Sequence, residues 1–166
     1  HSFFLAITNI LISKLTYEEE VVIGVPSNGR VGFESEGVVG MFVKTLPSRH
    51  LILGHQLFSD FLTEVHSHSL KRLDYQFYPL QEKDSEKLEQ SSFDYQIAYS
   101  TQRFHFDLKT LGKFQSFYYP FAHFPLLFSV VESHKGFDLV IEYDVQQFDY
   151  KTIQSYAQSF IHLCHQ

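Results

Sequence analysis

The stretch that decides the fold is "VVIGVPSNGRVGFESEGVVGMFVKTLPSR", residues 21–49, which holds five of the chain's 8 glycines between two short apolar runs. The first run follows "EEE", is rich in β-branched residues and stops at Pro26, which predicts an interior strand. The second run, "GMFVKTL" at residues 40–46, predicts another strand, which ends at Pro47. Between them, residues 26–38 form a loop whose glycines let the backbone approach something closely.

The composition fits one globular domain. The chain has 166 residues, 44% of them hydrophobic and 19% charged, and its 18 Phe and 10 Tyr indicate a bulky core or a large interface. A net charge of −6 without a basic cluster argues against a nucleic-acid partner. No apolar run reaches the roughly 20 residues that span a bilayer, so no membrane association is expected. The single cysteine, Cys164, excludes an internal disulfide framework and predicts a reducing, cytoplasmic location.

Helical spacing of apolar residues predicts three helices. The first, over residues 2–15, is largely buried, and the second covers residues 57–73. The third begins near Asp149, a residue type that caps helix N-termini well. The predicted buried faces are Phe58, Phe61, Leu62, Val65 and Ser69 in the second helix, and Ile153, Tyr156, Ala157, Phe160 and Ile161 in the third.

Alternation with a period of two predicts strands in the second half of the chain, at residues 93–101, 113–121, 125–132 and 137–145. The turn "SHKG" joins the last two as a hairpin, with Gly136 supplying the permissive dihedral. The charged run at residues 81–90 is typical of a solvated loop or short helix. These elements predict an α+β two-layer sandwich with a mostly antiparallel sheet and its helices on one face.

Most catalytic signatures are missing from the sequence, which has no P-loop, no G-x-S-x-G elbow and no dinucleotide-binding G-x-G-x-x-G. Cys164 lies among apolar residues of the last helix, which favours a structural thiol over a nucleophile. His66 and His68 form an H-S-H pair, but positions i and i+2 of a helix point apart, so no metal site is predicted. No catalytic residue is assigned within this chain.

Several segments carry one family's pattern in the same order along the chain. "VVIGVPSNGR" is similar to a "GTPVAGR"-like segment, and "GMFVKTLPSR" to a "GMFVNTLALR"-like core motif. "FSDFLTEVHSHSLKRLDYQFYPL" resembles a helix that ends in "HQDYPFEEL", and "SSFDYQIAYS" resembles the strand "NPLFDVMFSY". Together with the closing strand and helix, they resemble the C-terminal half of condensation domains of nonribosomal peptide synthetases. The resemblance identifies residues 1–166 as a single domain, the C-terminal half of such a domain.

That resemblance implies a chloramphenicol-acetyltransferase-like lobe, which faces an N-terminal lobe across a tunnel. Aminoacyl or peptidyl carrier proteins are the implied partners, and amide bonds form between the thioesters that they carry. Their phosphopantetheine arms enter the tunnel from opposite ends, and no cofactor is bound directly by the chain. The catalytic motif HHxxxDG belongs to the N-terminal lobe and does not occur in this sequence.

The resemblance also implies site residues. Arg30 occupies the place of a family arginine that pairs with the aspartate of the histidine motif in the other lobe, a task that suits a bidentate guanidinium. Lys44 stands where the family usually has Asn, and Gln76 where it has Pro, which weakens the case for catalysis. The tunnel floor loop is assigned to Ser27, Asn28, Gly29 and Gly32, and the tunnel-lining strand to Met41, Val43, Lys44 and Thr45.

Three functions stay open. The first is the lobe of an amide-forming enzyme, the second a degenerate platform that docks carrier proteins or partner enzymes without catalysis, and the third a stand-alone oligomeric acyltransferase. An intact HHxxxDG upstream of His1 would favour the first over the second. The chain starts within a helical pattern, which suggests a piece of a longer protein, and alone it is expected to be inactive. Residues 103–121 correspond to a latch that crosses to the other lobe, so the chain alone is expected to self-associate.

Overall fold

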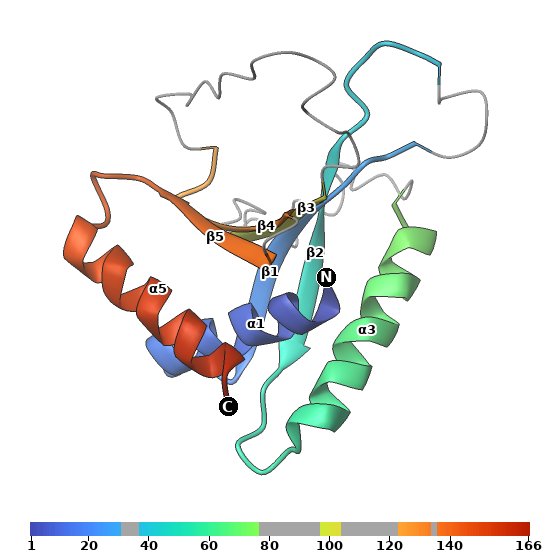
Figure 1. Ribbon diagram of the computed structural model, residues 1–166. Helices are drawn as coiled ribbons and strands as arrows, with labels where there is room; N and C mark the ends of the chain where they lie inside the picture. Colours follow the sequence, from blue (N-terminus) through green and yellow to red (C-terminus); the bar gives the residue numbers. More distant parts are fainter. Residues whose placement is uncertain (31–36, 77–96, 104–122, 134–135) are drawn as a thin grey trace, which may run out of the picture.

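The computed structural model describes residues 1–30, 37–76, 97–103, 123–133 and 136–166. Within these ranges the chain forms three helices and a five-stranded sheet, arranged as in Figure 1. The helices are α1 (Ser2–Thr16), α3 (Phe58–Asp74) and α5 (Tyr150–Cys164). The strands are β1 (Glu20–Ser27), β2 (Lys44–Leu51), β3 (Ile97–Arg103), β4 (Leu126–Ser133) and β5 (Gly136–Tyr143).

The strand order in the sheet is β2-β1-β3-β4-β5. β1 pairs with β2, and β4 with β5, in the antiparallel sense, whereas β3 is parallel to both of its neighbours. The prediction of a mostly antiparallel sheet is therefore wrong, because the sheet is mixed. The reason is that long connections lead into and out of β3, through α3 on one side and through residues 104–125 on the other. Connections of a dozen residues or more permit parallel pairing, which a short hairpin does not.

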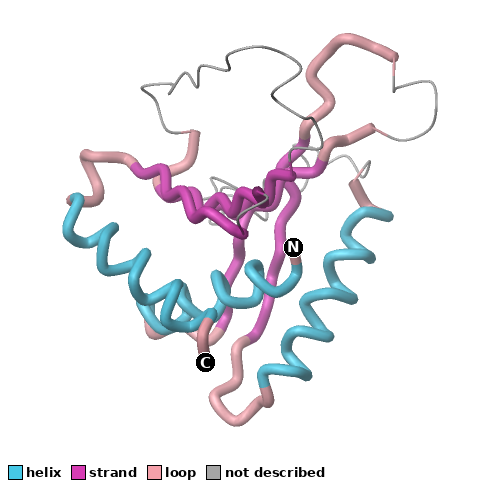
Figure 2. The backbone as a smooth tube through the Cα atoms, in the orientation of Figure 1, coloured by secondary structure: helices cyan, strands magenta, loops and turns pink. Residues whose placement is uncertain are grey.

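All three helices lie on one face of the sheet, so the predicted two-layer α+β architecture is confirmed (Figures 1 and 2). α1 contacts β1, α3 contacts β2 and α5 contacts β5. α1 also packs against both other helices and forms the middle of the helical layer. Among the described residues, no helix combines the length and the hydropathy needed to cross a membrane.

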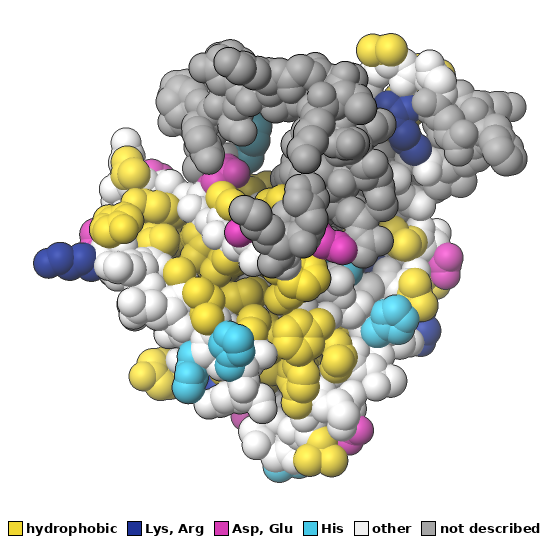
Figure 3. Space-filling view, in the orientation of Figure 1, with side chains coloured by type: hydrophobic (Ala, Val, Ile, Leu, Met, Phe, Trp, Pro, Cys, Tyr) yellow, Lys and Arg dark blue, Asp and Glu magenta, His cyan; other side chains and the backbone are white. Residues whose placement is uncertain are grey.

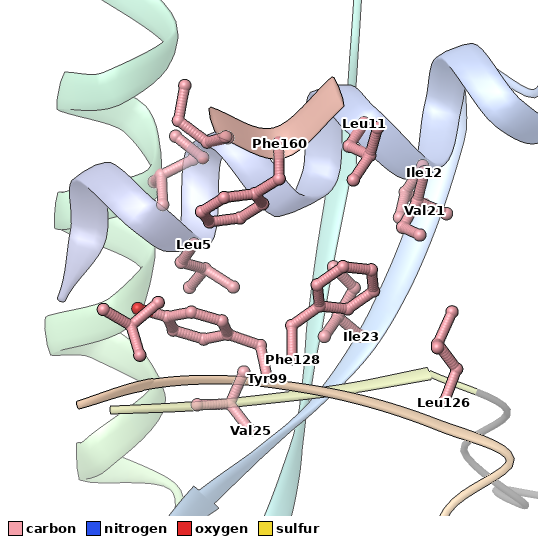
Figure 4. Packing of buried hydrophobic residues seen from close by; sticks show 14 of the residues in the cluster. Leu5, Leu11, Ile12, Val21, Ile23, Val25, Tyr99, Leu126, Phe128 and Phe160 are labelled. Carbon is pink, nitrogen blue, oxygen red and sulfur yellow. The ribbon is translucent and has the colours of Figure 1, made fainter. Parts of the chain in front are cut away.

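The core lies between the helical layer and the centre of the sheet, where apolar side chains of all three helices meet those of β1, β3 and β4 (Figure 4). Leu5 of α1, Ile23 of β1, Tyr99 of β3 and Phe128 of β4 are fully buried. The rings of Phe128 and Phe160 stack with their centroids 6.0 Å apart, which joins the sheet to α5. The predicted burial of the first helix is confirmed, since it supplies the residues that this core encloses.

The second predicted strand is displaced along the chain. Residues 40–43 lie outside any strand, and β2 continues through Pro47, which pairs with Gly24 of β1. β2 is an edge strand, where a missing N–H need not break a ladder. Pro26 likewise lies inside β1 and does not end it. The expectation that these prolines end the strands is therefore wrong.

The other elements follow the predictions closely. α3 buries Phe61, Val65 and Ser69, as expected, but Phe58, which was expected on the same face, is exposed at 40%. The N-cap of α5 is Asp149, whose side chain accepts a hydrogen bond from the backbone N–H of Thr152 at 2.8 Å. Ile161 was expected on the buried face of α5, but it is half exposed because that face is narrower than predicted.

The predicted hairpin near the end of the chain is confirmed as β4 and β5, which pair antiparallel along their lengths. Gly136 has a φ of +130°, a conformation that side-chain-bearing residues rarely adopt. The predicted strand at 113–121 and the charged run at 81–90 lie outside the described residues, as does nearly all of the predicted latch.

Candidate functional site

The loop between β1 and β2 is closed at its base by contacts between residues 28–30 and 38–42, which we call the loop neck. Gly29 has a φ of +64°, and a Cβ atom at this position would collide with the backbone carbonyl of Phe42. Glycine is therefore required here for two reasons, the left-handed dihedral and the close approach. The group that comes close to Gly29 is the chain's own backbone, at Phe42.

Arg30 ties the loop neck together from within. Its Nη1 donates a hydrogen bond to the carbonyl of Val38 at 3.0 Å, and its Nη2 donates to the carbonyl of Gly40 at 3.3 Å. The guanidinium carbon also lies 4.2 Å from the ring centroid of Phe42, a cation–π contact. Arg30 thus has a local structural role that the sequence did not indicate.

Beside the guanidinium, the loop neck exposes apolar side chains. Val39 and Met41 are almost fully exposed, at 101% and 92%, and Val43 is exposed at 53%. In Figure 3 apolar side chains of this loop lie next to a basic one at the upper right. A run of exposed apolar groups on a braced loop is typical of a surface that contacts something else.

The remaining predicted tunnel residues are divided between surface and interior. Asn28 and Lys44 are exposed, and Thr45 is half-buried. Ser27 is buried, and its hydroxyl donates to Oε1 of Gln76 at 3.0 Å, which fastens the end of β1 to the end of α3. The hydroxyl of Ser27 is thus engaged in the interior. Gly32 lies outside the described residues.

A second group of ionisable side chains lies where β2 meets α3, and sequence reasoning missed it. Nδ1 of His50 and Nδ1 of His68 are each 3.9 Å from Oε1 of Glu64. The two imidazole rings stack with centroids 5.4 Å apart and an interplanar angle of 21°. We call these three residues the β2–α3 cluster.

His50 is the buried member of the β2–α3 cluster, with 2% of its surface exposed. Burial lowers the pKa of His50 to about 4, with a further lowering by the charges of His68 and Arg72 and an opposing effect of Glu64. The imidazole is therefore neutral near pH 7. His66 points elsewhere, as predicted, because its Nδ1 lies 3.1 Å from Oγ of Ser2.

Neither Cys164 nor the concave surface near it provides reactive chemistry. Burial raises the pKa of the half-buried Cys164 thiol, which disfavours the reactive thiolate. Side chains of α1 and α5 line a groove. The ends of α1 and α5 that carry these side chains lie far from the loop neck (Figure 1). The lining of this groove holds His162 and Lys14 but no Asp or Glu side chain, so it offers no pair of carboxyl side chains for acid–base catalysis.

Comparisons with known proteins agree with the resemblance in the sequence. The description "Condensation domain" belongs to the family whose model matches residues 1–166. Surfactin synthase subunit 2 of Bacillus subtilis (strain 168) is 30% identical over an alignment of 172 positions, which covers 98% of this chain and 5% of that protein. Gramicidin S synthase 2 of Brevibacillus brevis is 31% identical over an alignment of 174 positions, which covers 96% of this chain and 4% of that protein. The chain thus spans a small part of the length of these relatives.

A solved structure shows the same fold. The condensation domain from the Monacolin K polyketide synthase superposes with a TM-score of 0.80 at 15% sequence identity, covering 98% of this chain and 40% of that one. The predicted family is therefore confirmed at the level of sequence, and the fold at the level of structure. Because the family model matches every residue, the chain belongs to the condensation domain family.

Proposed function

We propose that this chain is the C-terminal lobe of a condensation domain, in which it forms one wall of a tunnel for carrier-bound thioesters. The observation that carries the proposal is the loop neck, a braced backbone that exposes Val39, Met41 and Val43. The match to 40% of a solved condensation domain supports a second lobe outside this chain. The catalytic histidine then comes from that second lobe.

The loop neck suits contact with a thin substrate arm or with a partner lobe. Gly29 and Arg30 hold its two sides together, so the exposed apolar side chains need little further ordering on contact. Less conformational entropy is then lost when they are covered. Met41 adds an adaptable, polarizable side chain, which tolerates substrates that slide past it.

In the proposed reaction, the amine of one carrier-bound substrate attacks the thioester carbonyl of the other. The new C–N bond replaces the C–S bond, the sulfur leaves as a thiol, and the amine proton is passed on through the histidine of the other lobe. This chain contributes proximity and orientation, since its wall limits where the two arms can lie. No proton-transfer step is assigned to its own residues.

Arg30 has two roles in this proposal. It keeps the loop neck in shape through Val38, Gly40 and Phe42. Across the tunnel it pairs with the aspartate of the histidine motif, as the family resemblance implies. A planar guanidinium that is already oriented by an aromatic ring is suited to such a pair.

The test is amide formation between two carrier-bound aminoacyl thioesters, measured with the chain alone and with a complete domain. The complete domain carries an N-terminal lobe with an intact HHxxxDG joined ahead of His1. We expect product from the complete domain and none above background from the chain alone. Turnover by the purified chain, lost when one of its own histidines is replaced, would contradict the proposal.

The same experiment distinguishes the platform that docks carrier proteins without catalysis. Lys44 and Gln76 depart from the family pattern, but the bond between Gln76 and Ser27 shows that the fold accommodates one of these changes. If the complete domain binds carrier proteins and forms no amide, the platform replaces the enzyme. The cytoplasmic location and the self-association of the chain through residues 103–121 stay predictions.

A further inference from the structure

The β2–α3 cluster brings together side chains that are separated in sequence. His50 comes from the edge strand β2, while Glu64 and His68 lie one turn apart on α3, which runs beside that strand (Figure 1). Each offers one ligand atom, and the three atoms lie within 4.8 Å of one another. We propose that this cluster binds a divalent transition-metal ion, with zinc the best fit.

A buried nitrogen without a partner is the observation that points to a ligand. Within the part of the chain that the structure describes, Nδ1 of His50 makes no hydrogen bond, although the atom is fully buried. Its separation of 3.9 Å from Glu64 Oε1 is too long for one. Buried polar atoms in native proteins almost always have a partner, so this atom requires an explanation. A cation between His50 and Glu64 supplies one.

Neighbouring groups orient two of the three ligands. Nε2 of His50 lies 3.0 Å from the hydroxyl of Ser48, also buried. When Nε2–H donates to that oxygen, Nδ1 carries the lone pair that faces Glu64 and His68. Gln56 donates through Nε2 to the other carboxylate oxygen of Glu64 at 3.3 Å. Outer partners of this kind fix the tautomer and the orientation of metal ligands in known sites.

The ligand set selects the class of metal. Two imidazole nitrogens and one carboxylate oxygen suit zinc, with bonds of about 2.0–2.2 Å and a fourth position left for water. A pair of ligand atoms 3.9 Å apart can reach this geometry after a movement of about half an ångström. Hard cations such as magnesium and calcium prefer oxygen ligands and are not expected here.

One nearby charge opposes the ion. Arg72 lies one turn beyond His68 on α3, and its positive charge already disfavours a proton on His50. The carboxylate of Glu64 offsets this charge, so a bound zinc ion is held mainly by neutral nitrogens and one anion. We therefore expect affinity in the micromolar range and no dependence of folding on the metal.

The experiment uses two proteins, the chain alone and the complete domain. Each is first treated with a chelator to remove metal ions, and the chelator is then removed. Isothermal titration with zinc chloride gives stoichiometry and affinity, and visible absorption with cobalt chloride reports nitrogen ligands in a tetrahedral site. The variants are His68→Ala and Glu64→Gln, both at side chains that are at least partly exposed, with circular dichroism as a check of folding. His66→Ala is the matched control, since His66 lies on the same helix outside the cluster.

We expect one zinc ion per chain, a loss of at least tenfold in affinity for both variants, and unchanged binding by the control. The cobalt spectrum should change in the two variants and not in the control. Absence of saturable zinc binding would mean that a water molecule bridges His50 and Glu64, and would overturn the proposal. Equal affinity in all four proteins would place the metal on other histidines and overturn it as well.

Discussion

Strand β2 joins two regions that contrast in what they expose and what they bury. Before its first residue, the loop neck exposes Val39 and Met41 almost completely, although they are apolar. Near its last residue, the β2–α3 cluster buries a ring nitrogen of His50 that has no hydrogen-bond partner among the described residues. Both are departures from ordinary burial, in opposite directions. An exposed apolar side chain is stabilised when another surface covers it, while a buried lone pair is stabilised by a hydrogen-bond donor or a cation.

The two regions also differ in what holds them together. Backbone carbonyls and a left-handed glycine shape the loop neck, so it is sensitive to steric changes at Gly29 and to the loss of Arg30. Three ionisable side chains form the cluster, so it is expected to respond to pH and, on the proposal above, to metal ions. Each of the following predictions changes one region and leaves the other as its internal reference.

The largest effect expected in the chain alone is a loss of stability of the metal-free chain in acid. The pKa of His50 is about 4 in the folded chain and about 6.5 when unfolded. As the pH falls below 6.5, the unfolded chain therefore takes up this proton first and becomes favoured. The stability is complete above pH 6.5 and falls by about 3 kcal/mol by pH 4, at about 1.4 kcal/mol for each pH unit.

Urea unfolding between pH 4 and 7.5 with a chelator present measures this effect. The variant His50→Gln should show a shallower slope over the same range, while His66→Ala should keep the slope of the unmodified chain. Identical slopes in all three proteins would show that His50 does not carry the pH dependence.

The substitution Gly29→Ala should come next, with a loss of roughly 2 kcal/mol, because a left-handed conformation strains alanine. The new methyl group also meets the carbonyl of Phe42, so the loop neck must open. Hydrogen exchange at residues 37–45 and thermal unfolding detect the change. Gly37→Ala is the control, since nothing lies within 4 Å of the added atom there. Faster exchange in both variants would mean that the neck is not specifically closed at Gly29.

Arg30→Ala should cost about 1 kcal/mol in the chain alone, through two lost hydrogen bonds and the contact with Phe42. In the complete domain the loss should grow to roughly 3–5 kcal/mol if a desolvated pair with the aspartate of the other lobe is broken. Arg30→Lys keeps the positive charge but lacks the planar guanidinium with its paired N–H donors. It should therefore lose less stability than Arg30→Ala, but be less stable than the unmodified protein, both in the chain and in the complete domain. Equal losses in the chain and in the complete domain would confine Arg30 to the loop neck.

The smallest effect on stability is expected for Val39→Ser combined with Met41→Ser, within about 0.5 kcal/mol, since both side chains are exposed already. Association with the N-terminal lobe, measured by analytical ultracentrifugation, should nevertheless weaken. Leu70→Ser, an exposed apolar residue on α3, is the comparison that should leave association unchanged. If Leu70→Ser weakens association as much as the double variant does, the loop neck is not the contact surface.

The parts of the fold that depend on local periodicity could be predicted from the sequence. The buried positions Phe61 and Val65 follow helical spacing, and Asp149 is a capping residue recognisable by type. The parallel pairing of β3 could not be predicted, because periodicity reports which residues are buried and not which strand lies alongside. Pro47 was wrongly predicted to end a strand. A proline is tolerated there because β2 is an edge strand, and the strand order that puts β2 at the edge cannot be read from local sequence.

The functional regions show the same limit. The loop neck could be located from its glycines and the family motif, but the contacts of Arg30 with Val38 and Gly40 depend on a turn that the sequence does not specify. The β2–α3 cluster was missed because His50 is 14 residues from Glu64, on a different element. The i, i+4 spacing of Glu64 and His68 was the one local signal. It indicates that the two side chains share a face of the helix, but it does not indicate that His50 lies opposite them.

The central claim, that the loop neck lines the path of a carrier-bound arm, can be tested directly by cross-linking in the complete domain. In a Cys164→Ser background, Met41→Cys places a thiol on the neck, and Gln158→Cys places one on the exposed side of α5. A bifunctional maleimide then joins either thiol to the phosphopantetheine thiol of a holo carrier protein. We predict a cross-link from position 41 that needs the phosphopantetheine group, and background yield from position 158. Equal yields from both positions, or a yield at position 41 that persists with the apo carrier protein, would contradict the account.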